Sequence, residues 1–218
     1  MSILKNGTVT AQNVYELGSG STYTKVGTLT DNRGVFSGFS GTSYIDTNCT
    51  ISAFSDKLEI YGSYTTGTDL TNEKYIICLN PRNLGLQTIS SKFRMVVFNN
   101  NSNWVMASSS TTITANTFYQ YKIISDNTTI RFYLLTNSGW VNEISITLPT
   151  ASTAGPLSFG VFSPNNPKTS VTDGSIDIKD YEIKVSGKTI WNGLDAYLLN
   201  NNAKVGKYFI GGSGFYEV

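Results

Sequence analysis

The sequence SIDIKDYEIKVSGKTIWNG, residues 175–193, decides the fold class of this chain. Ile176 and Ile178 alternate with polar neighbours, and the apolar residues of the 181–185 segment alternate in the same way but in the opposite phase. Alternation of this kind is typical of β-strands with one buried face. The change of phase predicts a β-bulge or a bend at Lys179–Asp180.

The second half of this stretch predicts a hairpin. Ser186-Gly187 is a turn signal, and Thr189-Ile190-Trp191 begins the return strand. We expect Trp191 to pack in the core, because it follows this turn in the closing part of the stretch.

Length and charge limit the classes of function. The chain has 218 residues, which is enough to bury a full core in a single all-β domain. Charged residues make up 14% and the net charge is +1, so no basic footprint for nucleic acid or an anionic membrane is visible. No apolar run approaches the roughly 20 residues of a membrane span. We therefore expect neither a nucleic acid nor a membrane as partner.

The absence of histidine removes the nucleophile arrangements that use it and all histidine-based metal sites. Cys49 and Cys78 are the two cysteines. The first ten residues, MSILKNGTVT, lack the apolar core of a secretion signal, so we expect the chain to stay in the cell that makes it or to leave as part of a larger particle. In that setting free buried thiols are favoured over a disulfide, although pairing stays open.

The rest of the chain repeats short strands and polar turns. Residues 93–98 and 104–106 predict one hairpin, and residues 118–124 and 129–135 predict another with Asp126-Asn127 at its tip. In the second hairpin we expect Ile130, Phe132 and Leu134 to face inward. About a dozen such strands predict an all-β fold, a two-sheet antiparallel β-sandwich.

Four landmarks follow one another over residues 23–193. They are Tyr23-Thr24-Lys25-Val26-Gly27 with Gly38-Phe39-Ser40, Leu58-Glu59-Ile60, Phe118-Tyr119-Gln120-Tyr121-Lys122 with the 127–135 strand, and Ser175 to Trp191. In this order they resemble the concanavalin A-like, laminin-G jelly-roll superfamily, in the version found in tail, fibre and appendage proteins of bacterial viruses. The last landmark is similar to the family's closing G-S-I-D-L-K…V-D-G-K-x-x-W.

The resemblance implies a domain plan and a setting. Residues 1–22 would form a leader or attachment segment, residues 23–193 the jelly-roll domain, and residues 194–218 closing strands or an assembly tail with Tyr208, Phe209 and Ile210 exposed for docking. The protein would be a virion component assembled in the host cytoplasm. Its partners would be other virion proteins and host-surface glycan, and it would be a homo-oligomer, a trimer by analogy.

Some members of the superfamily hydrolyse glycans with glutamate and aspartate on one strand. The comparable strand here has Ser175 in place of the first glutamate, followed by Asp177, Asp180 and Glu182. Asp177 and Asp180 fall on opposite sides of the phase change, so they need not flank one scissile bond. We interpret these acids as a solvated outer edge, and we expect no catalytic residues and no enzyme.

Sugar binding needs flat aromatic rings for stacking and planar polar groups for hydroxyls. Two hairpins offer them, each with a tryptophan after a polar turn, and two tyrosines are expected on a concave sheet face. Packing in the core is the alternative for each tryptophan. The candidates are Trp104, Asn101 and Asn103, then Trp140, Asn137 and Asn142, and the tyrosines Tyr61 and Tyr133.

No cofactor is expected, although laminin-G-like domains often hold calcium. Four acids in or beside loops can supply oxygen ligands: Asp46, Asp69, Asp126 and Asp173. Because no D-x-D-x-D-G run is present, we treat them only as weak calcium candidates.

These observations leave three hypotheses. The first is a non-enzymatic virion appendage of tail or fibre type, whose jelly roll binds host-surface carbohydrate. The second is a purely structural head-fibre, collar or decoration protein, in which the leader and the tail dock on neighbouring subunits by strand addition. The third is a glycan-acting enzyme.

Overall fold

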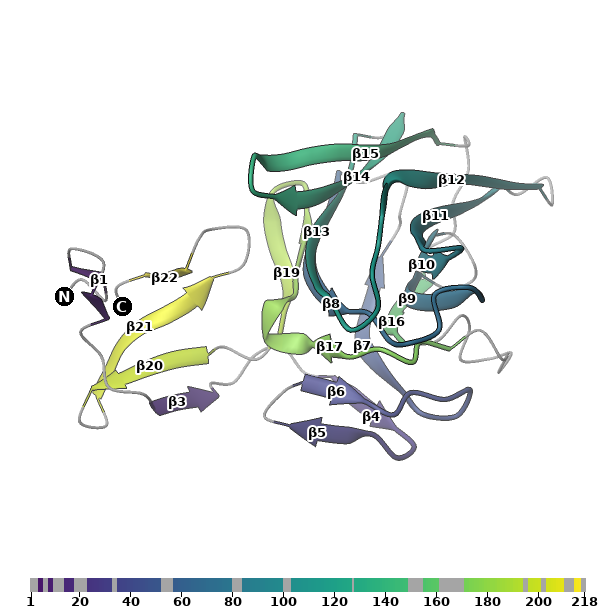
Figure 1. Cartoon of the computed structure of the whole chain (residues 1–218). Helices are drawn as coiled ribbons and strands as arrows, with labels where there is room; N and C mark the ends of the chain where they lie inside the picture. The colour runs from purple at the N-terminus through teal and green to yellow at the C-terminus, as the bar shows by residue number, and fades with distance from the viewer. Residues whose placement is uncertain are drawn as a thin grey trace.

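The computed structural model is built almost entirely of β-strands (Figure 1). The terminal strands before residue 23 and after residue 193 are described by their backbone pairing alone. The structure describes residues 4–5, 8–9, 14–17, 23–32, 35–51, 57–79, 84–99, 103–126, 128–148, 155–160, 171–193, 196–200, 203–209 and 214–216.

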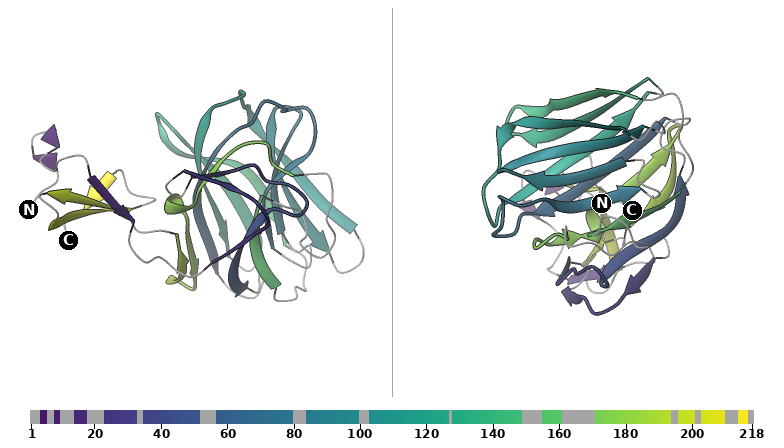
Figure 2. Two further views of the ribbon diagram at one scale, coloured as in Figure 1. Left: turned by 90° about the horizontal axis from the view of Figure 1, so that it is seen from below. Right: turned by 90° about the vertical axis from the view of Figure 1, so that its right-hand side faces the viewer.

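Two large antiparallel sheets form the layers of a sandwich (Figures 1 and 2). In the seven-stranded sheet the spatial order is β12 (Asn103–Thr112), β11 (Lys92–Asn99), β10 (Leu84–Ile89), β9 (Lys74–Leu79), β16 (Gly155–Phe159), β7 (Tyr44–Ile51) and β4 (Thr24–Val26). In the six-stranded sheet it is β15 (Gly139–Thr147), β14 (Thr129–Thr136), β13 (Phe118–Ser125), β8 (Leu58–Thr65), β18 (Glu182–Val185) and β19 (Lys188–Asn192). The expected two-sheet antiparallel sandwich is confirmed.

Smaller sheets complete the chain. A three-stranded sheet crosses one end of the sandwich, in the order β17 (Ile176–Asp177), β6 (Val35–Ser37) and β5 (Thr30–Asn32). β1 (Leu4–Lys5) pairs with β2 (Thr8–Val9). A four-stranded sheet lies beside the sandwich in the order β22 (Gly214–Tyr216), β21 (Ala203–Phe209), β20 (Ala196–Asn200) and β3 (Val14–Leu17).

This last sheet joins the two ends of the chain. β20 of the tail pairs with β3 of the leader, with Tyr197 opposite Glu16. Tyr208 and Phe209, expected to serve assembly, lie in β21, whereas Ile210 lies outside the described residues. The leader and the tail therefore form one sheet together.

One hydrophobic core fills the space between the two large sheets. Alternate residues of each strand point into it, including Ile130, Phe132 and Leu134 as the sequence predicts. Phe93 of the seven-stranded sheet meets Phe132 of the six-stranded sheet with ring centroids 5.3 Å apart. Cys78 is buried and Cys49 is half-buried, and the two do not form a disulfide with each other.

The 175–193 stretch changes sheets at its phase change. β17 pairs with β6, a one-turn 3-10 helix η1 (Ile178–Asp180) follows, and β18 then pairs with β8. The expectation of a bend is confirmed, but the device is a helical turn and not a β-bulge. The hairpin after it forms as expected, with Ser186 and Gly187 both at positive φ, and Trp191 is 2% exposed.

The acids of this stretch are not a solvated outer edge, so that expectation is wrong for two of them. Asp180 and Glu182 are only 4% and 7% exposed. Asp180 lies at the end of the helical turn, where it accepts a 2.6 Å hydrogen bond from the Ser63 hydroxyl. Glu182 accepts a 2.7 Å hydrogen bond from Thr189 and pairs with Lys184 at 3.1 Å. Buried carboxylates persist because such partners offset their loss of water.

A missing side chain at Gly62 makes room for the aromatic ring that anchors this turn. A Cβ atom at Gly62 would lie 2.3 Å from Cε1 of Tyr181. The Tyr181 hydroxyl donates to the Ser63 carbonyl at 2.9 Å, and it lies 2.6 Å from the Tyr121 hydroxyl, which must then be the donor of that second bond. Tyr181 thus ties β18 to β8 and β13 inside the core.

Replacing Gly62 tests this close approach. Gly62→Ala should lower the free energy of unfolding by about 3 kcal/mol, because the added methyl group would overlap the Tyr181 ring and the surrounding core must shift to accommodate both. As a control, Gly187→Ala places its Cβ in open space at a positive φ, and it should cost roughly 1 kcal/mol. Urea unfolding measures both, and equal losses would contradict the role given to Tyr181.

A glutamate clasp joins the two sheets at one edge. Glu143 of β15 accepts hydrogen bonds from the amides of Ser110 and Thr111 on β12, at 2.9 and 3.0 Å. It also accepts from both hydroxyls, at 2.5 and 2.6 Å. Burial raises the pKa of Glu143, but these four hydrogen bonds outweigh it and the net pKa is lowered. The clasp therefore favours the ionised carboxylate.

The clasp makes the free energy of unfolding depend on pH in the acidic range. A lowered folded-state pKa gives stability that is present above about pH 4.5 and is lost as the pH falls below it. Glu143→Gln should cost about 1–2 kcal/mol at pH 7, after allowing for screening by water, and the difference should shrink below pH 4. Asp31→Asn, which breaks an exposed pair with Lys25, should cost less than about 1 kcal/mol. A Glu143→Gln deficit that is as large at pH 3 as at pH 7 would contradict this account.

Candidate functional site

Strand register lines up five side chains across the outer face of the six-stranded sheet. Glu182 lies opposite Tyr61, Tyr61 opposite Lys122, Lys122 opposite Tyr133, and Tyr133 opposite Asn142. Residues directly opposite each other point to the same face of a sheet. Their strand neighbours Ile60, Tyr121 and Phe132 are buried at 0% exposure, so the row faces away from the core.

Two aromatic rings of this face hold a lysine between them. The Lys122 ammonium lies 4.9 Å from the Tyr133 ring centroid and 4.8 Å from the Trp140 ring centroid. Trp140 lies on β15 opposite Leu135, next to the row. We call Tyr61, Lys122, Tyr133, Trp140 and Asn142 the aromatic face. Each cation–π contact contributes roughly 0.5–1 kcal/mol, so the pair holds both rings in place.

A charged group of side chains borders the aromatic face at Tyr61. The Tyr61 hydroxyl donates to Glu59 at 3.0 Å, and the Lys184 ammonium lies 5.2 Å from the Tyr61 ring centroid. Burial raises the pKa of Tyr61 to about 12, and the hydrogen bond and charge of Glu59 and the charge of Glu182 act in the same direction. Tyr61 is therefore a neutral hydrogen-bonding group at any physiological pH.

Four of the residues expected to bind sugar come together in this way. Tyr61, Tyr133, Trp140 and Asn142 share the aromatic face, and the Asn142 amide donates to Ser145 at 3.1 Å. Asn137 is exposed in the turn before β15. The sequence placed these residues on one hairpin and two separate strands, and only the register unites them.

The second tryptophan hairpin lies on the other sheet. Trp104 pairs with Phe98 at the edge of the seven-stranded sheet and is 36% exposed. Asn103 belongs to β12 by its backbone, and Asn101 lies outside the described residues. The alternative of core packing does not hold for Trp104, and the two hairpins belong to different sheets.

Sequence reasoning missed Lys122 and the charged neighbours Glu59 and Lys184. Lys122 lies between Tyr121 and Ile123, whose apolar side chains mark it as an outward residue. This signal places Lys122 outside the core, but it gives no partner strand. The contact with Trp140, which lies on a strand two places away in the sheet, needs the full register.

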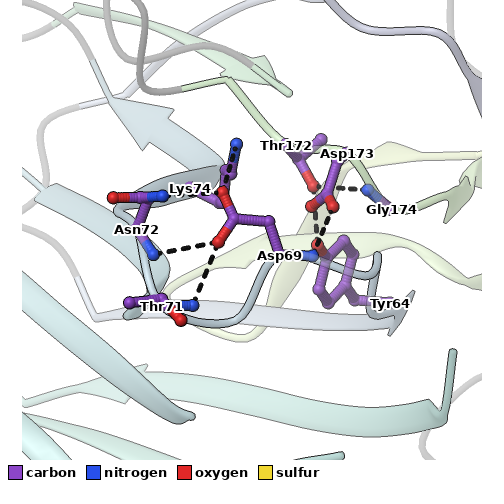
Figure 3. A network of polar contacts seen from close by, with 8 residues as sticks. All are labelled: Tyr64, Asp69, Thr71, Asn72, Lys74, Thr172, Asp173 and Gly174. Atoms are coloured by element: carbon purple, nitrogen blue, oxygen red, sulfur yellow. Dashed lines mark hydrogen bonds and ion pairs between the residues drawn. The ribbon is translucent and has the colours of Figure 1, made fainter. Parts of the chain in front are cut away.

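The calcium candidates Asp69 and Asp173 lie close together (Figure 3). Asp173 accepts a 2.8 Å hydrogen bond from the backbone amide of Asp69. The Asp69 carboxylate accepts from the amides of Thr71 and Asn72 and pairs with Lys74 at 3.2 Å. Hydrogen bonds from Asn72 lead the causes that hold the pKa of Asp69 well below its usual range. The carboxylate oxygens of Asp69 are therefore engaged within this loop.

The other two candidates lie in separate turns. Asp46 accepts from the Asn48 amide, and Asp126 accepts from Thr128 and Thr129 and pairs with Arg131 at 2.6 Å. Nowhere in the described ranges do three or more acidic, cysteine or histidine side chains gather as a metal ion would require. The expectation of no cofactor, with these four acids only as weak calcium candidates, stays a prediction.

A helix that could span a membrane is not found in the part of the chain that the structure describes.

Comparison with known proteins gives a fold and no family. No family model matches the sequence, and no curated protein resembles it in sequence. Among solved structures, the receptor-binding domain of botulinum neurotoxin C/D mosaic serotype is similar at 14% identity and a TM-score of 0.54, covering 83% of this chain and 46% of that one. The botulinum neurotoxin type G receptor-binding domain is similar at 16% identity and a TM-score of 0.51, covering 78% and 42%.

The chain thus spans less than half the length of these two domains. A similarity at this identity establishes the fold alone, a jelly-roll-like β-sandwich of the kind found in receptor-binding domains.

Tyr61 of the aromatic face can be titrated. In an absorbance titration, the difference between the parent chain and Tyr61→Phe should show a midpoint near pH 12. A raised pKa means that stability is present below about pH 10 and is lost as the pH rises toward 12. Glu59→Gln should lower the pKa of Tyr61 only part of the way, because burial is the larger cause, and Asp126→Asn should leave it unchanged. A midpoint near 10 would show that Tyr61 is freely solvated.

Proposed function

We propose that this chain is a non-enzymatic carbohydrate-binding module of a bacteriophage tail or fibre appendage, and that it binds host-surface sugar on the aromatic face. The observation that carries the proposal is the row in which Lys122 holds the rings of Tyr133 and Trp140 on the outer surface of the six-stranded sheet. Flat aromatic surface with polar groups at its border is what a sugar ring requires.

The ring positions and polar groups of the aromatic face suit weak but specific binding. The cation–π contacts favour one position of each ring before any ligand arrives, so less side-chain entropy is lost on binding than for unsupported rings. Tyr61 and Asn142 extend the row on either side with a hydroxyl and an amide. These groups can exchange hydrogen bonds with sugar hydroxyls while the aliphatic faces of the sugar stack on the rings.

The other parts of the proposal, namely receptor binding, the lack of catalysis and the phage appendage, rest on separate observations. The two similar solved structures named above are receptor-binding domains. A non-catalytic role agrees with the way the acids of the 175–193 stretch are engaged by Ser63, Thr189 and Lys184. The phage appendage and the trimeric assembly rest on the sequence resemblance of residues 23–193.

A purely structural role in a virus particle is the second candidate. The observation that favours it is the pairing of β3 with β20, which makes one sheet from the leader and the tail beside the sandwich. A sheet of this kind has open edge strands that can add a strand from a neighbouring subunit. This role and sugar binding use different parts of the chain.

A glycan array followed by calorimetry tests the binding proposal. The folded chain should bind at least one class of host-surface oligosaccharide with a Kd of about 1 mM or tighter. Trp140→Ala and Tyr133→Ala should each weaken binding by about tenfold or more, because each removes a stacking ring.

Trp104→Ala is the matched control, since it removes the same residue type from the other sheet and should leave affinity unchanged. Binding that depends on Trp104 and not on Trp140 would move the site to β12. A folded chain that binds no glycan would favour the structural role.

A further inference from the structure

Lys122 differs from the other lysine and arginine side chains in the groups that contact its charge. Most of the lysine and arginine side chains in the described residues have a carboxylate or carbonyl oxygen as partner, namely Lys25, Lys74, Lys92, Arg94, Arg131 and Lys184. Lys57 and Lys188 are exposed to water. Lys122 is half-buried, and among the described residues its ammonium contacts two aromatic rings and no oxygen acceptor.

The carboxylates around Lys122 are already engaged elsewhere. Glu59, from β8, is the acid whose charge acts on Lys122, and it accepts the Tyr61 hydroxyl. Glu182, from β18, pairs with Lys184 and Thr189. No other acid borders Lys122 on the two flanking strands, where Tyr61 and Tyr133 stand directly opposite. Burial lowers the pKa of Lys122 from its ordinary value, and the charge of Glu59 partly opposes this effect.

Among the residues that the structure describes, no oxygen atom accepts a hydrogen bond from the Lys122 ammonium. An aromatic ring attracts the charge of a lysine but accepts no conventional N–H···O bond, and an ammonium has three donors. Partial burial strengthens any bond that such a group forms with an anion relative to the same bond in open water. The site therefore offers a positive centre enclosed by two stacking surfaces.

We propose that the aromatic face selects an acidic saccharide, whose anionic group accepts hydrogen bonds from Lys122 while its ring stacks on Tyr133 or Trp140. This inference rests on the proposed function and narrows it to a class of sugar. A carboxylate or a sulfate on the sugar supplies the missing acceptor, through a charge-assisted bond about twice as strong as a neutral one. Neutral sugars would stack on the same rings and leave the ammonium without a partner.

The experiment compares acidic and neutral sugars on the full-length chain. An array carrying neutral, uronate-containing, sialylated and sulfated oligosaccharides gives the class. The best acidic ligand is then retested after its carboxyl groups are reduced to alcohols or its sulfates are removed, which distinguishes the two sources of charge. Carboxyl reduction or desulfation should weaken binding by about tenfold or more, and raising the salt from 50 to 500 mM should weaken the intact ligand alone.

Lys122→Gln should weaken acidic ligands about as much as removal of their charge does, and it should weaken neutral ligands far less, because these lose only the support that Lys122 gives to the Tyr133 and Trp140 rings. Lys188→Gln is the matched control, because it removes the same charge from an exposed position at the tip of the β18–β19 hairpin. The ligand-side comparison uses the parent chain, so it decides the question even if Lys122→Gln proves unstable.

The outcomes separate the two proposals. Binding of neutral and acidic sugars with equal affinity, unchanged by Lys122→Gln but lost in Trp140→Ala, would overturn the acidic-sugar inference and leave the proposed function standing. Binding to no sugar of any class by the folded chain would overturn both.

Discussion

The contact of Tyr181 with the backbone at Gly62 is the interaction on which the rest of the sandwich depends. The ring occupies the space that a side chain at Gly62 would fill, and it packs against Phe159 of the other sheet with centroids 4.5 Å apart. Its hydroxyl is satisfied by Tyr121 and by the Ser63 carbonyl. A buried hydroxyl with two partners has one favourable position. The chain that carries Tyr181 is therefore fixed where it leaves the three-stranded sheet and joins β8.

That fixed point sets the register of the outer face. Once β18 lies beside β8, Glu182 must stand opposite Tyr61, and the pairing of β8 with β13 brings Lys122 to the other side of Tyr61. Because side chains alternate along a strand, the buried position of Tyr121 requires its neighbour Lys122 to face outward. The core thus works as a rigid support for the aromatic face, and a site on such a support is held in place better than one on loops.

The acids of the 175–193 stretch show how a surface pattern can mislead. Three acids between apolar residues suggest an exposed edge, yet Asp180 and Glu182 are buried. The helical turn brings Asp180 over Ser63, and the neighbouring hairpin strand brings Thr189 to Glu182. These partners lie 117 and 7 residues away in the chain. The carboxylates therefore contribute to the join between strands.

The sequence by itself determined the class of fold, most of the strands and the hairpins, because alternation and turn residues are local signals. It also indicated Tyr133, Trp140 and Asn142 as candidate binding residues. The register between paired strands, by contrast, cannot be read from local signals in the sequence. Placing the turn at Asp126-Asn127 would set Lys122 opposite Arg131, whereas the hydrogen bond from the Asp126 amide to the Thr129 carbonyl at 3.0 Å sets it opposite Tyr133. Only the tertiary structure brought Tyr61, Lys122 and Trp140 to one face, because that requires strands far apart in the chain to pair in one sheet, and packing of the common core decides how they pair.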